Sequence, residues 1–296
     1  MTKKLSKAFS LIELSIVILI IGVLIAAAGQ GLDLLRDARV AAAQMLTQSS
    51  RVGSLKNLIL WLETTNSASI ANSEMVDGGT VSTWYDNNPQ MRDKNNATQA
   101  TDANRPTYLS NCVNSLPCLK FDGLTDFLDS TQNMNITTKE VSIFVVANAT
   151  NIPGTTDSTM PSLVATRSVS GGNWSDGDFN LRIFYSTLDY QMAGGYDARS
   201  MTIFPNQNYI FEVVDNGTVA NTYINGSLSP TPAAVTGVIK IIKLLEIGAV
   251  FYDNFPRGRY FGGSMSEVIV FDRALSIKER VAVESYLSKK WGIKTN

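Results

Sequence analysis

A long apolar run near the N-terminus constrains this chain more than any other feature, because the run contains a carboxylate. From Leu11 to Gly31 the only charged residue is Glu13, and Lys3, Lys4 and Lys7 precede the run. A charged side chain at the centre of a membrane helix costs roughly 2.5–3.5 kcal/mol on insertion scales. A carboxylate at this position therefore predicts a cationic partner outside the segment itself.

The helical pattern continues beyond the apolar run. No small-x-small cleavage site followed by a polar mature start is present, which argues against a simple cleaved signal peptide. Apolar residues recur near one helical face at Leu32, Leu35, Ala38, Ala42, Met45 and Leu46. A helix over 9–54 is about 70 Å long at 1.5 Å per residue, so about half of it extends beyond a bilayer core.

The stretch KAFSLIELSIVILIIGVLIAA resembles the class III signal of type IV pilins and type II secretion pseudopilins. The resemblance covers about residues 1–50 and rests on a short basic leader, on Phe9, and on Glu13 at the fifth position after the expected cut. It implies that a prepilin peptidase removes residues 1–8 by cutting between Ala8 and Phe9, and that the new amino group of Phe9 is methylated. The family usually has Gly before the cut, so Ala8 bears on the efficiency of cleavage.

The same resemblance implies a role for Glu13 in filament assembly. In a filament core, the carboxylate of one subunit meets the free ammonium of Phe9 on a neighbour, so that two charges neutralise each other. The implied partners are further copies of this chain, the prepilin peptidase and an inner-membrane pilus or type II secretion machinery. A plain membrane anchor, in which Glu13 is protonated or reaches the interface, is the alternative.

The pattern changes after about Ser54, where short β-prone runs alternate with turn residues, as in an all-β sandwich. The expected strands are 58–63, 118–123, 141–149, 162–168, 179–186, 209–215, 219–226, 243–250 and 265–272. The sequence DNGT at 215–218 predicts a tight hairpin. Ser276 and Glu279 predict a capping box that opens a C-terminal helix, with Gly292 just past its end.

This half resembles the concanavalin A-like, laminin-G-like jelly-roll module of bacterial surface proteins. The matching pieces include LILWLETTNS, VSTWYDNN, LKFDGLTDFLDS and GGSMSEVIVFDRALSIKERVAVESYLSKKWGI. The expected fold class is α+β, with a leader at 1–8, a transmembrane and filament-core helix at 9–54, and a β-sandwich with a C-terminal helix at 55–296. Within the sandwich, Trp61, Trp84, Phe121 and Phe127 are expected in the core, and Arg273 is expected to pair with a carboxylate such as Glu267.

Composition excludes several kinds of chemistry. The chain has no histidine, which removes the Ser-His-Asp triad and every His-ligated metal site. The formal net charge of −1 makes nucleic acid an unfavourable partner. The two cysteines, Cys112 and Cys118, favour a small-loop disulfide in an exported domain, with two reduced thiols as the alternative. A glycosidase needs two carboxylates at a defined separation, but Glu212 and Asp215 fall on opposite faces of a strand, so no enzyme is expected.

The segment GGNWSDGDFN at 171–180 is the best polar constellation for a ligand or ion. Its oxygen donors Asp176, Asp178 and Asn180 are candidate Ca²⁺ ligands, although the EF-hand spacing is missing, and a solvated hairpin loop is the alternative. An aromatic face beside amide and carboxylate groups is what a sugar requires. The candidate ligand-binding residues on expected loops are Trp174, Tyr196, Tyr252 and Asn254.

These observations predict a pilin-like subunit that displays a lectin-like domain for adhesion or glycan binding. The precursor is expected in the inner membrane and the mature chain in a cell-surface filament. Two alternatives stay open: a type II secretion pseudopilin in a periplasmic pseudopilus, and an uncleaved, membrane-anchored carbohydrate-binding module.

Overall fold

A computed structural model describes residues 11–131, 134–150, 152, 160–167, 177–192, 196–251 and 257–296, without the side chains of 11–13, 23–30, 32, 33, 196 and 200. Contacts divide the chain into two compact units, Met1–Ala42 and Ala43–Asn296. The second unit therefore begins inside the expected N-terminal helix rather than after it.

The N-terminal helix α1 is continuous from Leu11 to Ser49, and Val52–Ser54 form a short 3-10 turn after it. Among the described side chains of its apolar run, Leu14, Ile18 and Leu19 are more than half exposed. No helix in the described part of the chain is both long enough and apolar enough to span a membrane, in contrast to the transmembrane segment expected within 9–54.

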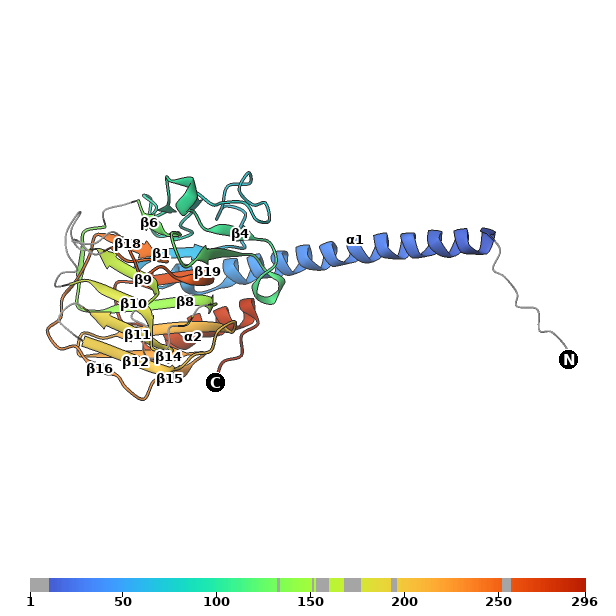
Figure 1. The fold of residues 1–296 in the computed structure, drawn as a ribbon. Coiled ribbons are helices and arrows are strands. Elements are labelled where there is room, and N and C mark those ends of the chain that lie inside the picture. Colours follow the sequence, from blue (N-terminus) through green and yellow to red (C-terminus); the bar gives the residue numbers. More distant parts are fainter. Residues whose placement is uncertain are drawn as a thin grey trace. The chain divides into compact units, whose positions relative to one another are not determined.

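Sheet A is the larger of two antiparallel sheets in the second unit (Figure 1). Its spatial order is β15 (Ser227–Leu228), β14 (Val219–Ile224), β13 (Asn208–Asp215), β8 (Val141–Ala149), β19 (Gly262–Phe271), β5 (Cys118–Asp122) and β4 (Thr107–Leu109). Two further strands pair with this path: β1 (Leu58–Glu63) with β19, and β16 (Ala233–Ala234) with β14.

Sheet B carries the opposite layer of the sandwich. Its spatial order is β12 (Tyr196–Thr202), β11 (Thr187–Met192), β10 (Phe179–Phe184), β9 (Ser162–Arg167), β18 (Leu244–Ile247), β6 (Leu128–Ser130), β3 (Ala97–Thr98) and β2 (Thr83–Trp84). A separate pair joins β17 (Lys240–Ile242) to β7 (Ile136–Thr138), and 3-10 turns occupy Asp102–Asn104 and Val113–Ser115.

Apolar side chains from both sheets form one core between the layers, including Phe211 of sheet A and Tyr190 of sheet B. Strands β8 and β19 are buried on both faces, which explains the apolar runs at 143–147 and 268–271 within them. Trp84 and Phe121 are buried as expected, and Trp61 is buried but lies outside this core cluster. Phe127 is only half-buried, so its expected core position is wrong.

Turn chemistry shortens two of the expected strands. Strand β10 ends at Phe184 because Tyr185 (φ 46°) and Ser186 (φ 61°) form a two-residue turn with positive φ at both positions. Strand β14 ends at Ile224 for the same reason, since Asn225 and Gly226 turn the chain into β15. The hairpin expected at 215–218 is confirmed, with Asp215 opposite Ala220 across the β13–β14 turn.

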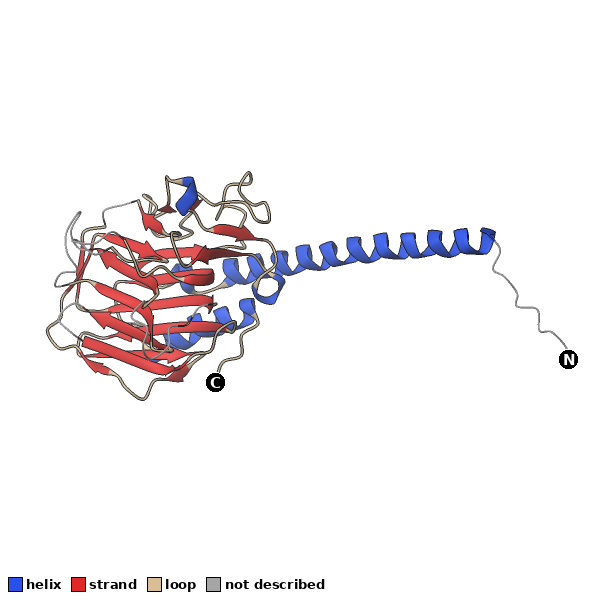
Figure 2. Ribbon diagram, in the orientation of Figure 1, coloured by secondary structure: helices blue, strands red, loops and turns tan. Residues whose placement is uncertain are grey.

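The C-terminal helix α2 spans Ile277–Trp291 and is among the helices drawn in blue in Figure 2. Its two ends follow the expected capping rules. The Ser276 side chain accepts from the Glu279 N–H, the Glu279 side chain accepts from the Ser276 N–H, and Gly292 closes the helix in the left-handed region (φ 65°). Arg273 forms an ion pair with Glu279 at 2.8 Å rather than with Glu267, because Glu279 lies in the first turn of the same local segment.

Glu267 is instead part of a buried polar cluster, which we call the Lys290 cluster: Thr47, Glu63, Glu267, Tyr286, Lys290, Trp61 and Trp291. The Lys290 Nζ lies 2.7 Å from Glu63 Oε2 and 2.9 Å from Glu267 Oε2. It also donates to Thr47 Oγ1 at 2.9 Å. The last turns of α1 are thus bonded into the β-sandwich unit, which explains why that unit begins at Ala43.

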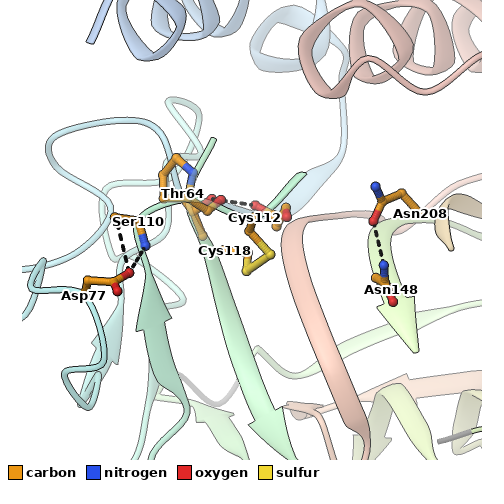
Figure 3. The surroundings of a disulfide bond; sticks show 9 residues. Thr64, Asp77, Ser110, Cys112, Cys118, Asn148 and Asn208 are labelled. Atoms are coloured by element: carbon orange, nitrogen blue, oxygen red, sulfur yellow. Dashed lines mark hydrogen bonds between the residues drawn. A yellow bond between two sulfur atoms is a disulfide. The ribbon is translucent and has the colours of Figure 1, made fainter. Parts of the chain in front are cut away.

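Cys112 and Cys118 form a disulfide that closes a six-residue separation at the start of β5 (Figure 3). Nearby, the Thr64 hydroxyl donates to the Pro117 carbonyl at 2.6 Å, and Asp77 accepts from the Ser110 N–H and hydroxyl. These bonds fix the loop that enters β5.

Candidate functional site

One face of sheet B carries a transverse row of polar side chains, which we call the polar face. Side chains alternate along a strand, so Glu246 points away from the core that its neighbours Leu245 and Ile247 enter. Strand register aligns seven positions across the sheet: Thr98, Asp129, Glu246, Ala165, Asn180, Gln191 and Asp197.

An acidic pair on β6 and β18 occupies one end of the polar face. Asp129 and Glu246 are direct cross-strand neighbours, and the Arg257 Nη2 bridges them at 2.6 Å and 3.3 Å. Arg167 of β9 approaches the same two carboxylates at 3.6 Å and 3.7 Å. The guanidinium of Arg257 also lies 3.8 Å from the centroid of the Phe127 ring, which explains why this ring is at the surface of the core rather than inside it.

The other end of the polar face is built by β10, β11 and β12. Arg182 Nε lies 2.7 Å from Asp189 Oδ2, and both side chains are buried. Asp189 faces Arg199 across the β11–β12 ladder, and Arg182 also approaches Asp197 at 3.7 Å. Alternating charges on neighbouring strands therefore neutralise each other along this end.

Two uncharged residues, Ala165 and Asn180, lie between the two charged ends, and both are fully buried. Ala165 of β9 lies opposite Asn180 of β10, and the Asn180 Oδ1 accepts from the Ser162 hydroxyl at 2.7 Å. The Asn180 Nδ2 is buried and has no hydrogen-bond partner among the described residues. A buried amide donor left unpaired is costly unless a ligand or water accepts its hydrogen bond.

Burial makes the carboxylates of the polar face sensitive to pH. It raises the pKa of Glu246 to about 7, although Arg257 and Arg167 oppose the shift. It likewise raises the pKa of Asp189 to about 6 against the attraction of Arg182. Each group therefore changes between hydrogen-bond donor and acceptor near neutral pH.

Most of the predicted ligand residues cannot be compared with this geometry. Trp174, Asp176, Tyr252 and Asn254 lie outside the described residues, as do Ala8 and Phe9. Tyr196 begins β12 opposite Met192, without a described side chain.

Two of the candidate Ca²⁺ ligands, Asp178 and Asn180, are buried at the start of β10. No group of three or more His, Cys, Asp or Glu side chains arranged to hold a metal occurs among the described residues. The Ca²⁺ assignment stays a prediction.

Sequence reasoning missed the charged members of the polar face. The sequence does contain a signal for these residues, which is the alternation of polar and apolar positions along two strands. Asn180 and Arg182 alternate with apolar residues in FNLRIF, and Asp189 and Gln191 do so in TLDYQM. Period-two alternation places each pair on one face, but only the strand register shows that the two faces coincide.

Comparison with known families identifies the N-terminal segment. Residues 3–29 match the prokaryotic N-terminal methylation motif. The chain thus carries a prepilin-type motif, as the sequence resemblance implied. No curated protein sequence matches the chain.

Comparison with solved structures identifies the fold of the β-sandwich. The Trypanosoma rangeli sialidase in complex with 2,3-difluoro-KDN superposes with a TM-score of 0.52 and 14% identity, over 82% of this chain and 34% of that one. The same sialidase in complex with sialic acid superposes with a TM-score of 0.51 and 14% identity, again over 82% of this chain and 34% of that one. This chain thus spans about a third of the length of the sialidases that it matches. The similarity shows a jelly-roll, concanavalin-like β-sandwich and nothing about activity.

Proposed function

We propose that this protein is a pilin-type filament subunit that displays a saccharide-binding jelly-roll domain. The observation that carries the proposal is the continuity of α1, which begins within a prokaryotic methylation motif and ends hydrogen-bonded into the sandwich through Thr47. One helix thus joins the segment that carries the methylation motif to the displayed domain.

Processing follows from the motif. The prepilin-type segment directs the precursor to the inner membrane, and the peptidase cuts between Ala8 and Phe9. The freed amino group of Phe9 is methylated, and it neutralises the Glu13 carboxylate of a neighbouring subunit in the filament. The exposed apolar side chains of α1, such as Leu14, Ile18 and Leu19, provide the surface that packs in the filament core.

Ligand binding is assigned to the polar face. Charged side chains there are paired with one another, while Asn180 retains an unpaired amide donor beside the small Ala165. This arrangement suits an uncharged hydroxyl-rich ligand more than an ion. Many weak sites along one filament raise avidity by orders of magnitude when the target is also multivalent.

Binding is favoured over catalysis because the carboxylates considered for glycoside hydrolysis are already engaged. Glu212 is paired with Arg280 at 2.7 Å, and Asp215 with Lys240 at 2.5 Å. Both pairs are buried within the described structure, where a carboxylate held by a cation is poorly placed to act as nucleophile or general base.

A glycan array probed with purified filaments, with and without EDTA, tests the display function. Ala165→Leu places bulk beside the Asn180 amide, so binding that is lost in this variant while its thermal unfolding midpoint stays at the wild-type value supports the polar face as the ligand site. If the wild type binds without EDTA but not with it, recognition depends on a bound cation. If it binds in neither condition, the proposed lectin function is wrong.

Electron microscopy of sheared surface material tests the kind of assembly. Long surface fibres support a pilus. Assembly confined to the periplasm would favour a type II secretion pseudopilin, and an uncleaved monomer would favour an anchored binding module.

A further inference from the structure

A pocket lies on the β-sandwich unit, beside the end of α1. Its lining residues are Thr47, Gln48, Ser50, Gly53, Ser54, Trp61, Asn66, Asn87 and Pro89, and its volume is about 390 Å³. Small-molecule sites in proteins occupy about 300–1,000 Å³, so this pocket is large enough for a small ligand. We call it the Trp61 pocket.

The chemistry of the lining restricts what the Trp61 pocket binds. None of its nine lining residues carries a charge, although charged side chains are common elsewhere on this unit. An ionic ligand would lose its hydration without gaining a counter-charge there. The amides of Gln48, Asn66 and Asn87 and the hydroxyls of Ser50 and Ser54 supply both donors and acceptors, which is what sugar hydroxyls require.

The aromatic part of the lining is the accessible edge of Trp61, which is 4% exposed, and the ring is held rigidly by its buried neighbours. The Trp61 indole N–H donates to Glu267 Oε1 at 2.7 Å, and the ring meets Tyr286 edge-to-face with centroids 6.3 Å apart. The Trp61 backbone N–H also donates to Asp86 at 2.9 Å. A ring fixed in this way loses no rotamer freedom when a ligand contacts it.

The amide wall is ordered as well. Asn66 Nδ2 donates to Asn87 Oδ1 at 2.9 Å, and Asn87 Nδ2 donates to Ser69 Oγ at 2.8 Å. Gly53 allows the 3-10 turn to close the pocket, since a Cβ there would lie 2.9 Å from the Pro89 ring. In contrast, Gln48 is exposed on α1 and makes no side-chain hydrogen bond within the described residues, so its amide is available.

We infer that the Trp61 pocket binds an uncharged saccharide, at a site separate from the polar face. The inference rests on an aromatic wall combined with amide and hydroxyl groups and no charge. It does not depend on the polar face, because the two sites share no residue.

The test uses the full-length chain in detergent and an array of neutral oligosaccharides, with uronic acid and sialylated oligosaccharides as charged probes. The wild type is expected to bind neutral probes in preference to charged ones. Gln48→Ala removes one hydrogen-bonding group and is expected to weaken binding about three- to ten-fold. Gln48→Trp fills the pocket from an exposed helical position and is expected to remove the neutral-probe binding that remains when Ala165→Leu blocks the polar face.

Ser49→Ala is the matched control, because Ser49 neighbours Gln48 on α1 but lines a different cleft. Equal thermal unfolding midpoints for the three variants show that the fold is intact. Absence of neutral-probe binding, a preference for charged probes, or unchanged binding by Gln48→Trp would overturn the inference. Binding that is lost in Ala165→Leu but kept in Gln48→Trp would support the polar face and reject the Trp61 pocket.

Discussion

Glu63 and Glu267 lie directly opposite each other in the β1–β19 ladder, and Lys290 of α2 bridges their carboxylates. Two like charges in facing positions on a sheet repel each other, so a buried cation is required between them. Burial works to raise the pKa of Glu63, but Lys290 and the hydrogen bonds from Thr65 outweigh it and hold this pKa below its usual value. Since Lys290 also bonds to Thr47, the neutralising cation is the link between the sandwich and α1.

Removal of the Lys290 ammonium is predicted to destabilise the sandwich strongly. Lys290→Met leaves two carboxylates buried without their counter-charge, and breaking a buried pair in this way costs about 3–5 kcal/mol. Chemical denaturation of the purified chain measures the loss in the free energy of unfolding. Lys289→Met is the control, because this neighbouring lysine is exposed. A loss below about 1 kcal/mol in Lys290→Met would show that the Lys290 cluster contributes little to the stability of the sandwich.

Glu246 is predicted to make stability depend on pH near neutrality. The pKa of Glu246 in the folded chain is about 7, above the ordinary value of 4.5. Its stabilising contribution to the free energy of unfolding is therefore fully present below pH 4.5 and is lost as pH rises through 7. Glu246→Gln keeps this side chain neutral at every pH. The fall in the free energy of unfolding between pH 5 and pH 8 should therefore be smaller in this variant than in the wild type by about 2–4 kcal/mol.

Denaturation series at several pH values measure this difference. Asp93→Asn serves as the control, since Asp93 is an exposed carboxylate. Parallel pH profiles for the wild type and Glu246→Gln would contradict the assignment of a raised pKa.

The disulfide is predicted to contribute modestly, because it closes a short loop. The sequence separation of Cys112 and Cys118 is six, for which loop-closure entropy gives about 2 kcal/mol. The double variant Cys112→Ala, Cys118→Ala should lose this amount in denaturation experiments and become insensitive to reductant. If reductant lowers the free energy of unfolding of the double variant as much as that of the wild type, the loss does not come from this disulfide.

Glu13→Ala is predicted to separate processing from assembly. Peptidase recognition depends on the residues around the cut, so the leader should still be removed. Incorporation should fall sharply, because the Phe9 ammonium of the neighbour is left without a partner. Quantification of sheared filaments against total mature protein measures this effect. Ser15→Ala, a neutral change in the same apolar run, should assemble normally, and a normal filament yield from Glu13→Ala would contradict the proposed pairing.

Local rules in the sequence predicted much of the fold. The capping box of α2 and the hairpin after Asp215 depend on residues within a few positions of one another, and both occur as expected. The turn at Tyr185 and Ser186 was missed, because these residues rarely adopt positive φ and so give no turn signal.

The interactions within the β-sandwich unit that bind the last turn of α1 and build the polar face could not be predicted from the sequence, for a physical reason. Lys290 lies in the last turn of an amphipathic helix, where a lysine is normally exposed, and its partner Glu63 is 227 positions away. The polar face likewise joins residues from strands far apart in the chain, such as Asp129 and Glu246. Alternation shows which side chains share a strand face, but it does not show which strands become neighbours.

We propose that the methylation motif is processed so that α1 enters a filament. Mass spectrometry of the N-terminal peptide, from cells that process comparable prepilins, tests this most directly. We expect a mature chain that begins at a methylated Phe9. A chain that retains residues 1–8 in those cells would contradict it, because the ammonium that is proposed to neutralise Glu13 would never form.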